Sequence, residues 1–204
     1  MPATPTALLL LLAFLIGSIP FGYLLYRVAT GQDIRRAGSG NIGATNVMRS
    51  AGAKLGVLTL LLDAGKGYVA LWLGERWAHG HAAVLAAMLF LVILGHLYSP
   101  WLRFRGGKGV ATALGSFLAL TPGPLLGALA VFVLVLLAWR YVSLASIAAC
   151  AALPLLLLIP LRQGGLAPVT EAAAVAVAAL IVVRHRTNLG RLRRGTEAKL
   201  GARP

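Results

Sequence analysis

The sequence predicts an all-α fold, a polytopic integral membrane helix bundle with about seven transmembrane helices. Of its 204 residues 59% are hydrophobic, and the mean hydropathy is +0.84. The apolar residues stand in long runs, which is typical of membrane proteins. Several runs approach the 20 residues or so that a helix needs to cross a hydrocarbon layer of roughly 30 Å. We therefore expect one membrane-embedded domain over residues 1–204.

The seven expected spans follow one another with short connections. Hydropathy places them at residues 5–27, 55–74, 82–100, 109–121, 123–139, 142–160 and 167–183. The first run has no basic residue before it and is too long for a signal-peptide core, so we interpret it as an uncleaved span. The fourth run is short and meets a proline-glycine turn after Thr121. A half-helix that enters and returns is the alternative there.

The basic residues orient these spans. The formal net charge is +14, but Lys and Arg flank apolar runs, so membrane orientation explains them and nucleic acid is not an expected partner. Seven crossings with the N-terminus outside leave only Arg76 and Arg162 outside. A re-entrant fourth segment would move Arg140 outside and place the tail opposite the first two basic loops. We therefore favour seven spans with a cytoplasmic C-terminus.

Metal and disulfide chemistry have little support in the sequence. Cys150 is the single cysteine and stands in an apolar run, so neither a disulfide framework nor a cysteine zinc site can form. His79 and His81 form a pair without a third ligand nearby, which is typical of solvated loop residues. We expect no metal and no cofactor.

Residues 38–52 form the first of three polar segments expected on the inside. The glycines match a dinucleotide fingerprint formally, but a transmembrane run precedes them where that fingerprint needs a strand. Glycine lets backbone amides approach an anion, and Arg49 supplies a bidentate charge. Close helix packing is the alternative, but it leaves the neutral donors unexplained. The candidate ligands with Arg49 are Ser39, Gly40, Asn41, Thr45 and Asn46.

Residues 96–112 form the second polar segment, in which a glycine turn opens a helix. Such a turn directs free amides and the positive end of the helix dipole at one place, with Lys108 beside them, which favours phosphate. It is not a nucleotide P-loop, because Leu102 replaces the first glycine and Gly109 replaces the magnesium-binding hydroxyl. For Lys108, contact with anionic lipid is the alternative. The candidate ligands are Gly106, Gly107, Lys108 and Gly109.

Asp63, Lys66 and His96 are ionisable residues that fall within or at the end of spans. Asp63 and Lys66 lie three apart on one helical face, where they form either an internal ion pair or, through Lys66, a ligand contact. His96 either accepts a proton or satisfies a backbone carbonyl. We include Lys66 and His96 among the candidate substrate ligands.

Residues 184–200 form the third polar segment, after the last span. Anchoring at the membrane surface explains its arginines. It explains His185, Asn188 and Glu197 less well, so these three become candidate site residues.

Together the three segments, with residues 17–23 and 63–67, closely resemble the bacterial acyl-phosphate:glycerol-3-phosphate acyltransferase family, PlsY. The resemblance covers nearly the whole chain. It implies transfer of a fatty acyl group from acyl-phosphate to the first hydroxyl of glycerol-3-phosphate, giving lysophosphatidic acid and phosphate in phospholipid biosynthesis. It also implies a multi-pass protein of the bacterial cytoplasmic (inner) membrane whose active site faces the cytoplasm. The catalytic residues that it implies are Ser39, Arg49, His185, Asn188 and Glu197.

An acyl-phosphate is already an activated anhydride, so we expect direct attack by the glycerol hydroxyl, with orientation and charge stabilisation as the main contributions. The proton leaves to His185 or to a substrate phosphate oxygen. An acyl-enzyme on Ser39 is less attractive, because no histidine accompanies it within its motif.

Two other classes of function compete. Intramembrane charges also mark transporters of phosphate compounds or lipids, but no inverted repeat is visible and the polar groups gather at one face. A membrane-surface scaffold needs only the basic residues and leaves the neutral donors without a role. Oligomeric state and acyl-chain preference are not predicted.

Overall fold

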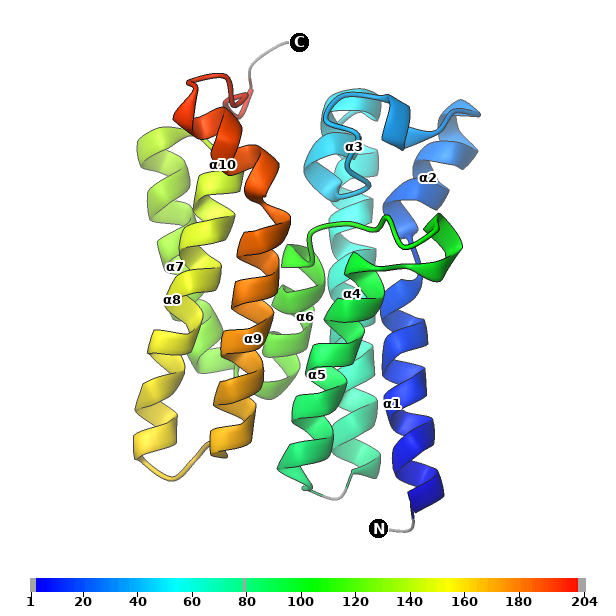
Figure 1. Cartoon of the computed structure of the whole chain (residues 1–204). Helices are drawn as coiled ribbons and strands as arrows, with labels where there is room; N and C mark the ends of the chain where they lie inside the picture. The colour runs from blue at the N-terminus through cyan, green and yellow to red at the C-terminus, as the bar shows by residue number, and fades with distance from the viewer. Residues whose placement is uncertain (1–2, 79, 202–204) are drawn as a thin grey trace. The chain divides into compact units, whose positions relative to one another are not determined.

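The computed structural model describes residues 3–78 and 80–201, and its regular elements over that range are helices (Figure 1). They form two compact units, one ending at Leu120 and one beginning at Thr121. The expectation of a single domain over residues 1–204 stays a prediction. His79 lies outside the described residues.

The first unit begins with a broken span. The helices α1 (Ala3–Ser18) and α2 (Phe21–Thr30) occupy the run that the sequence predicted as one helix. The break falls at Pro20, which has no amide hydrogen and disfavours helical backbone at the residue before it. The remaining elements are η1 (Ile34–Arg36), α3 (Ala44–Ala51), α4 (Ala53–Trp77), α5 (Ala82–Leu97), η2 (Pro100–Leu102) and α6 (Val110–Leu120).

Glycines let the helices of this unit pack backbone against backbone. A Cβ at Gly17 of α1 would strike the carbonyl of Val92 in α5, and one at Gly95 of α5 would strike the carbonyl of Phe14 in α1. Small residues permit such close approach in membranes. The end of α2 and the whole of α3 lie at the end of the unit opposite the start of α1 (Figure 1), and the first polar segment lies there with them.

The second unit contains α7 (Pro122–Trp139), α8 (Val142–Arg162), α9 (Pro168–Arg184) and α10 (Arg186–Arg193). The last two helices meet at a bend of 54°. In this unit α10 lies at the end where α7 joins α8 (Figure 1). The third polar segment is therefore at the same end as Arg140.

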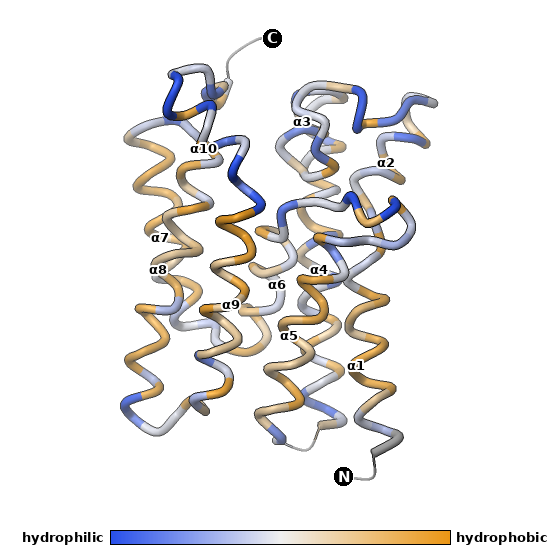
Figure 2. The backbone as a smooth tube through the Cα atoms, viewed as in Figure 1, coloured by the Kyte–Doolittle hydropathy of each residue, from blue (hydrophilic) through white to orange (hydrophobic). Residues whose placement is uncertain are grey.

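The predicted polytopic, all-α membrane fold is confirmed, with a qualification on the number of spans. Within residues 3–78 and 80–201, five helical segments are long and apolar enough to cross a bilayer, and the bent pair of α9 and α10 makes a sixth if it counts as one span. The fourth expected span, residues 109–121, contains only α6, which has 11 residues and therefore rises only about 16 Å, half the hydrocarbon thickness. In each unit the long helices are apolar and polar residues gather beyond them (Figure 2). The orientation of the termini stays a prediction.

Candidate active site

The first polar segment is held in shape by a buried amide. Asn46 accepts a hydrogen bond from the backbone amide of Ser39 at 2.8 Å. It also donates to the carbonyls of Ala37 at 3.0 Å and Asn41 at 2.8 Å. Gly38 has a φ of 54°, and a Cβ there would strike Asn46. Asn46 was predicted as a substrate ligand, but its side chain is engaged within the segment, so we now interpret it as a positioning residue.

The same segment presents other polar groups outward. Asn41 accepts from the amide of Gly43 at 2.7 Å and so shapes the turn that leads into α3. Ser39 and Arg49 are exposed, and their side chains make no hydrogen bond or ion pair with residues in the described ranges. Thr45 and Arg49 lie four apart on α3 and therefore on one helical face. Ser39, Thr45 and Arg49 thus remain candidates for binding an anion.

The glycine turn of the second segment packs against the end of α5. The amide of Gly106 donates to the carbonyl of Leu97, and that of Gly107 donates to the carbonyl of His96, both at 3.1 Å. A Cβ on Gly107 would strike the His96 ring, so any side chain there requires the ring or the turn to move. The amides of these two glycines, both predicted as substrate ligands, are therefore engaged within the protein. The amides left for an anion are those of the first turn of α6, from Val110 onward.

Lys66 and His96 belong to a buried cluster behind this turn. The Lys66 ammonium lies 2.7 Å from Asp63 Oδ1 as an ion pair. It also donates to the carbonyl of Ile19 at 2.7 Å and lies 2.9 Å from His96 Nδ1. An ammonium has three donors, and three protein groups already surround this one. The structure therefore favours the internal ion pair over substrate contact by Lys66.

This cluster also fixes the state of the His96 ring. Because Lys66 can only donate, Nδ1 of His96 accepts, and the proton of the neutral imidazole lies on Nε2. His96 is therefore a poor proton acceptor at Nδ1, which was one of the two roles predicted for it. Instead the His96 ring packs against Gly107.

The backbone carbonyls freed by the break between α1 and α2 accept hydrogen bonds from Lys66 and from residues that precede the glycine turn. The hydroxyl of Ser99 donates to the carbonyl of Ser18 at 2.6 Å, and Lys66 donates to the next carbonyl, that of Ile19. Trp101 Nε1 donates to the hydroxyl of Ser18 at 2.9 Å. Carbonyls freed by a broken helix inside a membrane need such partners, so the break and the turn stabilise each other.

Glu197 organises the third polar segment. Its carboxylate accepts hydrogen bonds from Ser143 at 2.7 Å, and from Asn188 and Arg191 at 2.6 Å each. Burial alone would raise the pKa of Glu197, but these three donors outweigh it and lower the pKa below its ordinary value. Glu197 is therefore an anchor for α10, and Ser143 is its partner from α8. Ser143, which stands 54 residues from Glu197, was not among the residues predicted from the sequence.

His185 lies buried at the bend between α9 and α10. Its Nδ1 is 2.8 Å from the carbonyl of Ile181. A carbonyl only accepts, so Nδ1 carries the proton, and in the neutral ring the lone pair is on Nε2. This tautomer suits a proton acceptor that acts through Nε2. His185 is therefore the candidate general base of this segment, through Nε2.

The tail beyond α10 returns to the turn between α7 and α8. The amide of Leu200 donates to the carbonyl of Arg140 at 2.6 Å, and the Arg140 guanidinium donates to the carbonyl of Leu200 at 3.1 Å. The positive-inside rule grouped Arg140 with the tail, and within this unit the two do lie at one end.

Comparison with known proteins identifies the family of this chain. The sequence model of a family described as glycerol-3-phosphate acyltransferase matches residues 7–195. The chain belongs to this family. A glycerol-3-phosphate acyltransferase of Geotalea daltonii is 48% identical over 200 residues, which are 95% of this chain and 97% of the relative. One of Syntrophotalea carbinolica is 47% identical over 195 residues, with coverage of 96% and 97%.

A solved structure of PlsY (YgiH), an integral membrane glycerol 3-phosphate acyltransferase in its glycerol 3-phosphate form, is also similar. It is 39% identical, with a TM-score of 0.90 and coverage of 96% of both chains. The lysophosphatidic acid form of PlsY gives 37% identity and a TM-score of 0.86, with coverage of 96% of this chain and 95% of that one. The resemblance to the PlsY family is therefore confirmed.

Within this acyltransferase family assignment, the structure divides the candidate residues by what their side chains do. Asn46, Lys66, His96 and Glu197 hold other parts of the protein in place. Ser39, Thr45 and Arg49 carry polar groups that face outward. The neutral His185 ring carries its proton on Nδ1, next to the Ile181 carbonyl. Gly40 has a φ of 71°, which only glycine adopts readily. The roles of Ser39, Arg49, Lys108, His185 and Asn188 in binding or catalysis stay predictions.

Proposed function

We propose that this chain transfers a fatty acyl group from acyl-phosphate to the first hydroxyl of glycerol-3-phosphate, giving lysophosphatidic acid and inorganic phosphate. One observation carries the proposal. PlsY structures that match nearly the entire chain are described as glycerol 3-phosphate and lysophosphatidic acid forms, and these compounds are the acceptor and the product of this reaction. The family assignment also sets aside the transporter and scaffold alternatives.

The reaction joins the acceptor oxygen to the acyl carbon in one displacement. The hydroxyl oxygen attacks the acyl carbonyl, an oxyanion forms, and the bond between the acyl carbon and the phosphate oxygen breaks. The hydroxyl proton passes to Nε2 of His185 or to a phosphate oxygen of a substrate. Phosphate departs with the electron pair of the broken bond. Since the anhydride is already activated, positioning and electrostatics supply most of the rate enhancement.

Both substrates carry phosphate, and the structure offers two kinds of group for it. Arg49 provides an exposed guanidinium beside the Asn46-held turn, which suits bidentate binding of phosphate. The first-turn amides of α6 follow Lys108 and add the positive end of a helix dipole. We assign Arg49 and Lys108 to the phosphates, Ser39 to hydrogen bonding at the same turn, and Asn188 and Glu197 to the placement of α10.

The location follows from the same chemistry. Glycerol-3-phosphate is soluble, whereas the donor and the product each carry an acyl chain, so the reaction belongs at a membrane surface. The basic loops would place that surface on the cytoplasmic side of the inner membrane of a bacterium. Free amino groups introduced at either terminus and labelled from one side of sealed vesicles would test this orientation.

The test of the assigned residues is acyl transfer by purified variants. Arg49→Ala should abolish lysophosphatidic acid formation, because the phosphate then loses its bidentate partner. Arg162→Ala is the matched control, since it removes an exposed arginine at the end of α8 and should leave turnover unchanged. Near-normal turnover of Arg49→Ala would show that the site is misplaced.

A further inference from the structure

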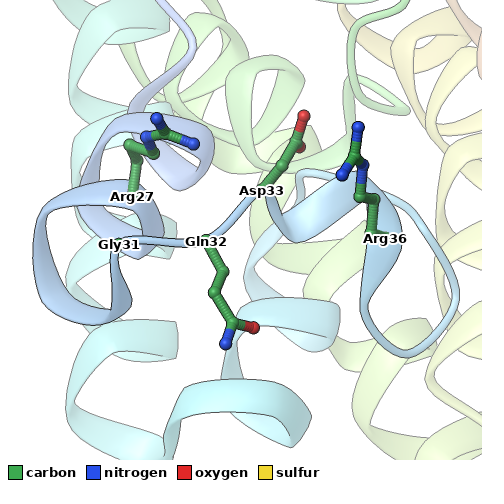
Figure 3. A pocket seen from close by; sticks show the side chains of 5 residues that line it. All are labelled: Arg27, Gly31, Gln32, Asp33 and Arg36. Atoms are coloured by element: carbon green, nitrogen blue, oxygen red, sulfur yellow. The ribbon is translucent and has the colours of Figure 1, made fainter.

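A pocket lined by arginine lies at the end of α2, outside the segments assigned to acyl transfer. Its volume is about 420 Å³, and its lining residues are Arg27, Gly31, Gln32, Asp33 and Arg36. This volume falls in the range of roughly 300–1,000 Å³ that holds small ligands. The side chains of Arg27, Asp33 and Arg36 point to one side of the turn, and that of Gln32 points to the other (Figure 3). Two guanidinium groups therefore border one opening.

The charge of the pocket is positive because its single acid is already neutralised. Asp33 accepts hydrogen bonds from Arg35 at 2.6 to 3.1 Å, through the guanidinium and the backbone amide. The side-chain hydrogen bonds from Arg35 lower the pKa of Asp33 to about 2, so the carboxylate stays ionised and paired. The guanidinium groups of Arg27 and Arg36 have no hydrogen bond or ion pair with any residue that the structure describes. Two unpaired positive charges remain.

The surroundings indicate a ligand that has both a charged and an apolar part. The pocket begins at the last turn of the apolar segment Pro5–Thr30, the depth at which a membrane helix meets lipid headgroups. Leu24 lies one turn before Arg27, and Val28 follows it. Both are exposed, Leu24 by 44% and Val28 by 88%. A small soluble anion has no apolar part to pack against these side chains, whereas the acyl chain of a phospholipid does.

We propose that this pocket binds the phosphate headgroup of an anionic phospholipid, with the lipid chains lying along Leu24 and Val28. Arg27 and Arg36 hold the phosphate oxygens, because a guanidinium matches phosphate geometry in a bidentate manner. The Asp33–Arg35 pair holds the turn in shape between them. The pocket shares no residue with the three polar segments, so the bound lipid is neither the acceptor nor the donor of the reaction.

Lipid binding to the purified protein tests the proposal directly. Native mass spectrometry in a mild detergent, with phosphatidylglycerol added, should resolve one tightly held lipid per chain. Arg27→Gln with Arg36→Gln should weaken that binding by roughly 30-fold, since each basic residue near an anionic lipid contributes about a factor of five. The double substitution Arg76→Gln with Arg162→Gln removes equal charge at the ends of other spans and should change the affinity less than twofold.

One further variant and one competition experiment distinguish a bound lipid from other anionic ligands. Asp33→Asn removes the carboxylate charge but can still accept the backbone hydrogen bond from Arg35 that shapes the turn, so it should tighten phosphatidylglycerol binding, a change opposite in sign to that of the arginine variants. Inorganic phosphate and glycerol-3-phosphate at millimolar concentration should not displace the lipid. Displacement by either would overturn the proposal in favour of a free phosphate site. Equal loss in the two double variants would also overturn it, because binding would then follow total charge and not this pocket.

Discussion

Replacement of Lys66 by methionine should destabilise the protein strongly without changing how it binds substrate. Lys66 and Asp63 are 5% and 2% exposed, and the ammonium is the ion-pair partner of Asp63. Removing one partner of a buried pair leaves a charge without compensation, which costs about 3–5 kcal/mol. The carbonyl of Ile19 also loses its donor. We therefore expect a loss of about 4 kcal/mol in the free energy of unfolding.

A double-mutant cycle on Asp63 and Lys66 distinguishes a structural role of Lys66 from a role in substrate binding. Asp63→Asn combined with Lys66→Met removes both charges, so the remaining loss should be about 1–3 kcal/mol, the usual cost of a buried group left without its hydrogen bond. The double variant should therefore be more stable than Lys66→Met alone. Lys54→Met is the control, because Lys54 is an exposed lysine of the same helix and should change stability by less than 0.5 kcal/mol.

The assay is reversible denaturation of the purified protein in detergent micelles, followed by KM for glycerol-3-phosphate on the folded fraction. The account predicts an unchanged KM in both the single and the double variant. A KM raised tenfold or more, with the stability of Lys66→Met equal to that of Lys54→Met, would refute the reasoning. Lys66 would then contact substrate, which is the other of the two roles that the sequence left open.

Three further predictions follow from the contacts of the site. Gly107→Ala places a methyl group against the His96 ring. A displacement of the turn by about 1 Å should lower kcat/KM roughly 100-fold. In steady-state assays the loss should appear chiefly as a higher KM. Asn46→Ala leaves the amide of Ser39 without its acceptor and should lower the free energy of unfolding by about 1–3 kcal/mol in denaturation curves. Glu197 has a lowered folded pKa, so its contribution to stability is present above its ordinary pKa of 4.5 and is lost as the pH falls through the folded value. Thermal unfolding between pH 6 and 3 should therefore show a smaller acid loss in Glu197→Gln than in the wild type.

Long apolar runs and glycine-rich polar segments could be read from the sequence, because each is a local pattern. The spans and the placement of Arg140 with the tail are examples. The break in the first span was missed, although Pro20 was its signal, because hydropathy alone does not register a missing amide hydrogen. The helix α3 was missed as well, because a short helix rich in polar residues gives no hydropathy signal.

Contacts between distant positions could not be read from one sequence. Glu197 meets Ser143 across 54 residues, and Lys66 meets His96 across 30. Patterns of residue type therefore identified which side chains were unusual, but not which of them were already satisfied by the protein. That difference separates Lys66 and Asn46, which hold the fold, from Arg49, whose guanidinium faces outward.

Product formation from a defined acyl donor tests the central claim most directly. Purified protein given acyl-phosphate and glycerol-3-phosphate should form lysophosphatidic acid and release one phosphate for each product molecule. Acyl-CoA in place of acyl-phosphate should give no product, because the departing phosphate is what Arg49 and Lys108 are proposed to hold. Absence of lysophosphatidic acid with acyl-phosphate, or equal turnover with acyl-CoA, would contradict the account.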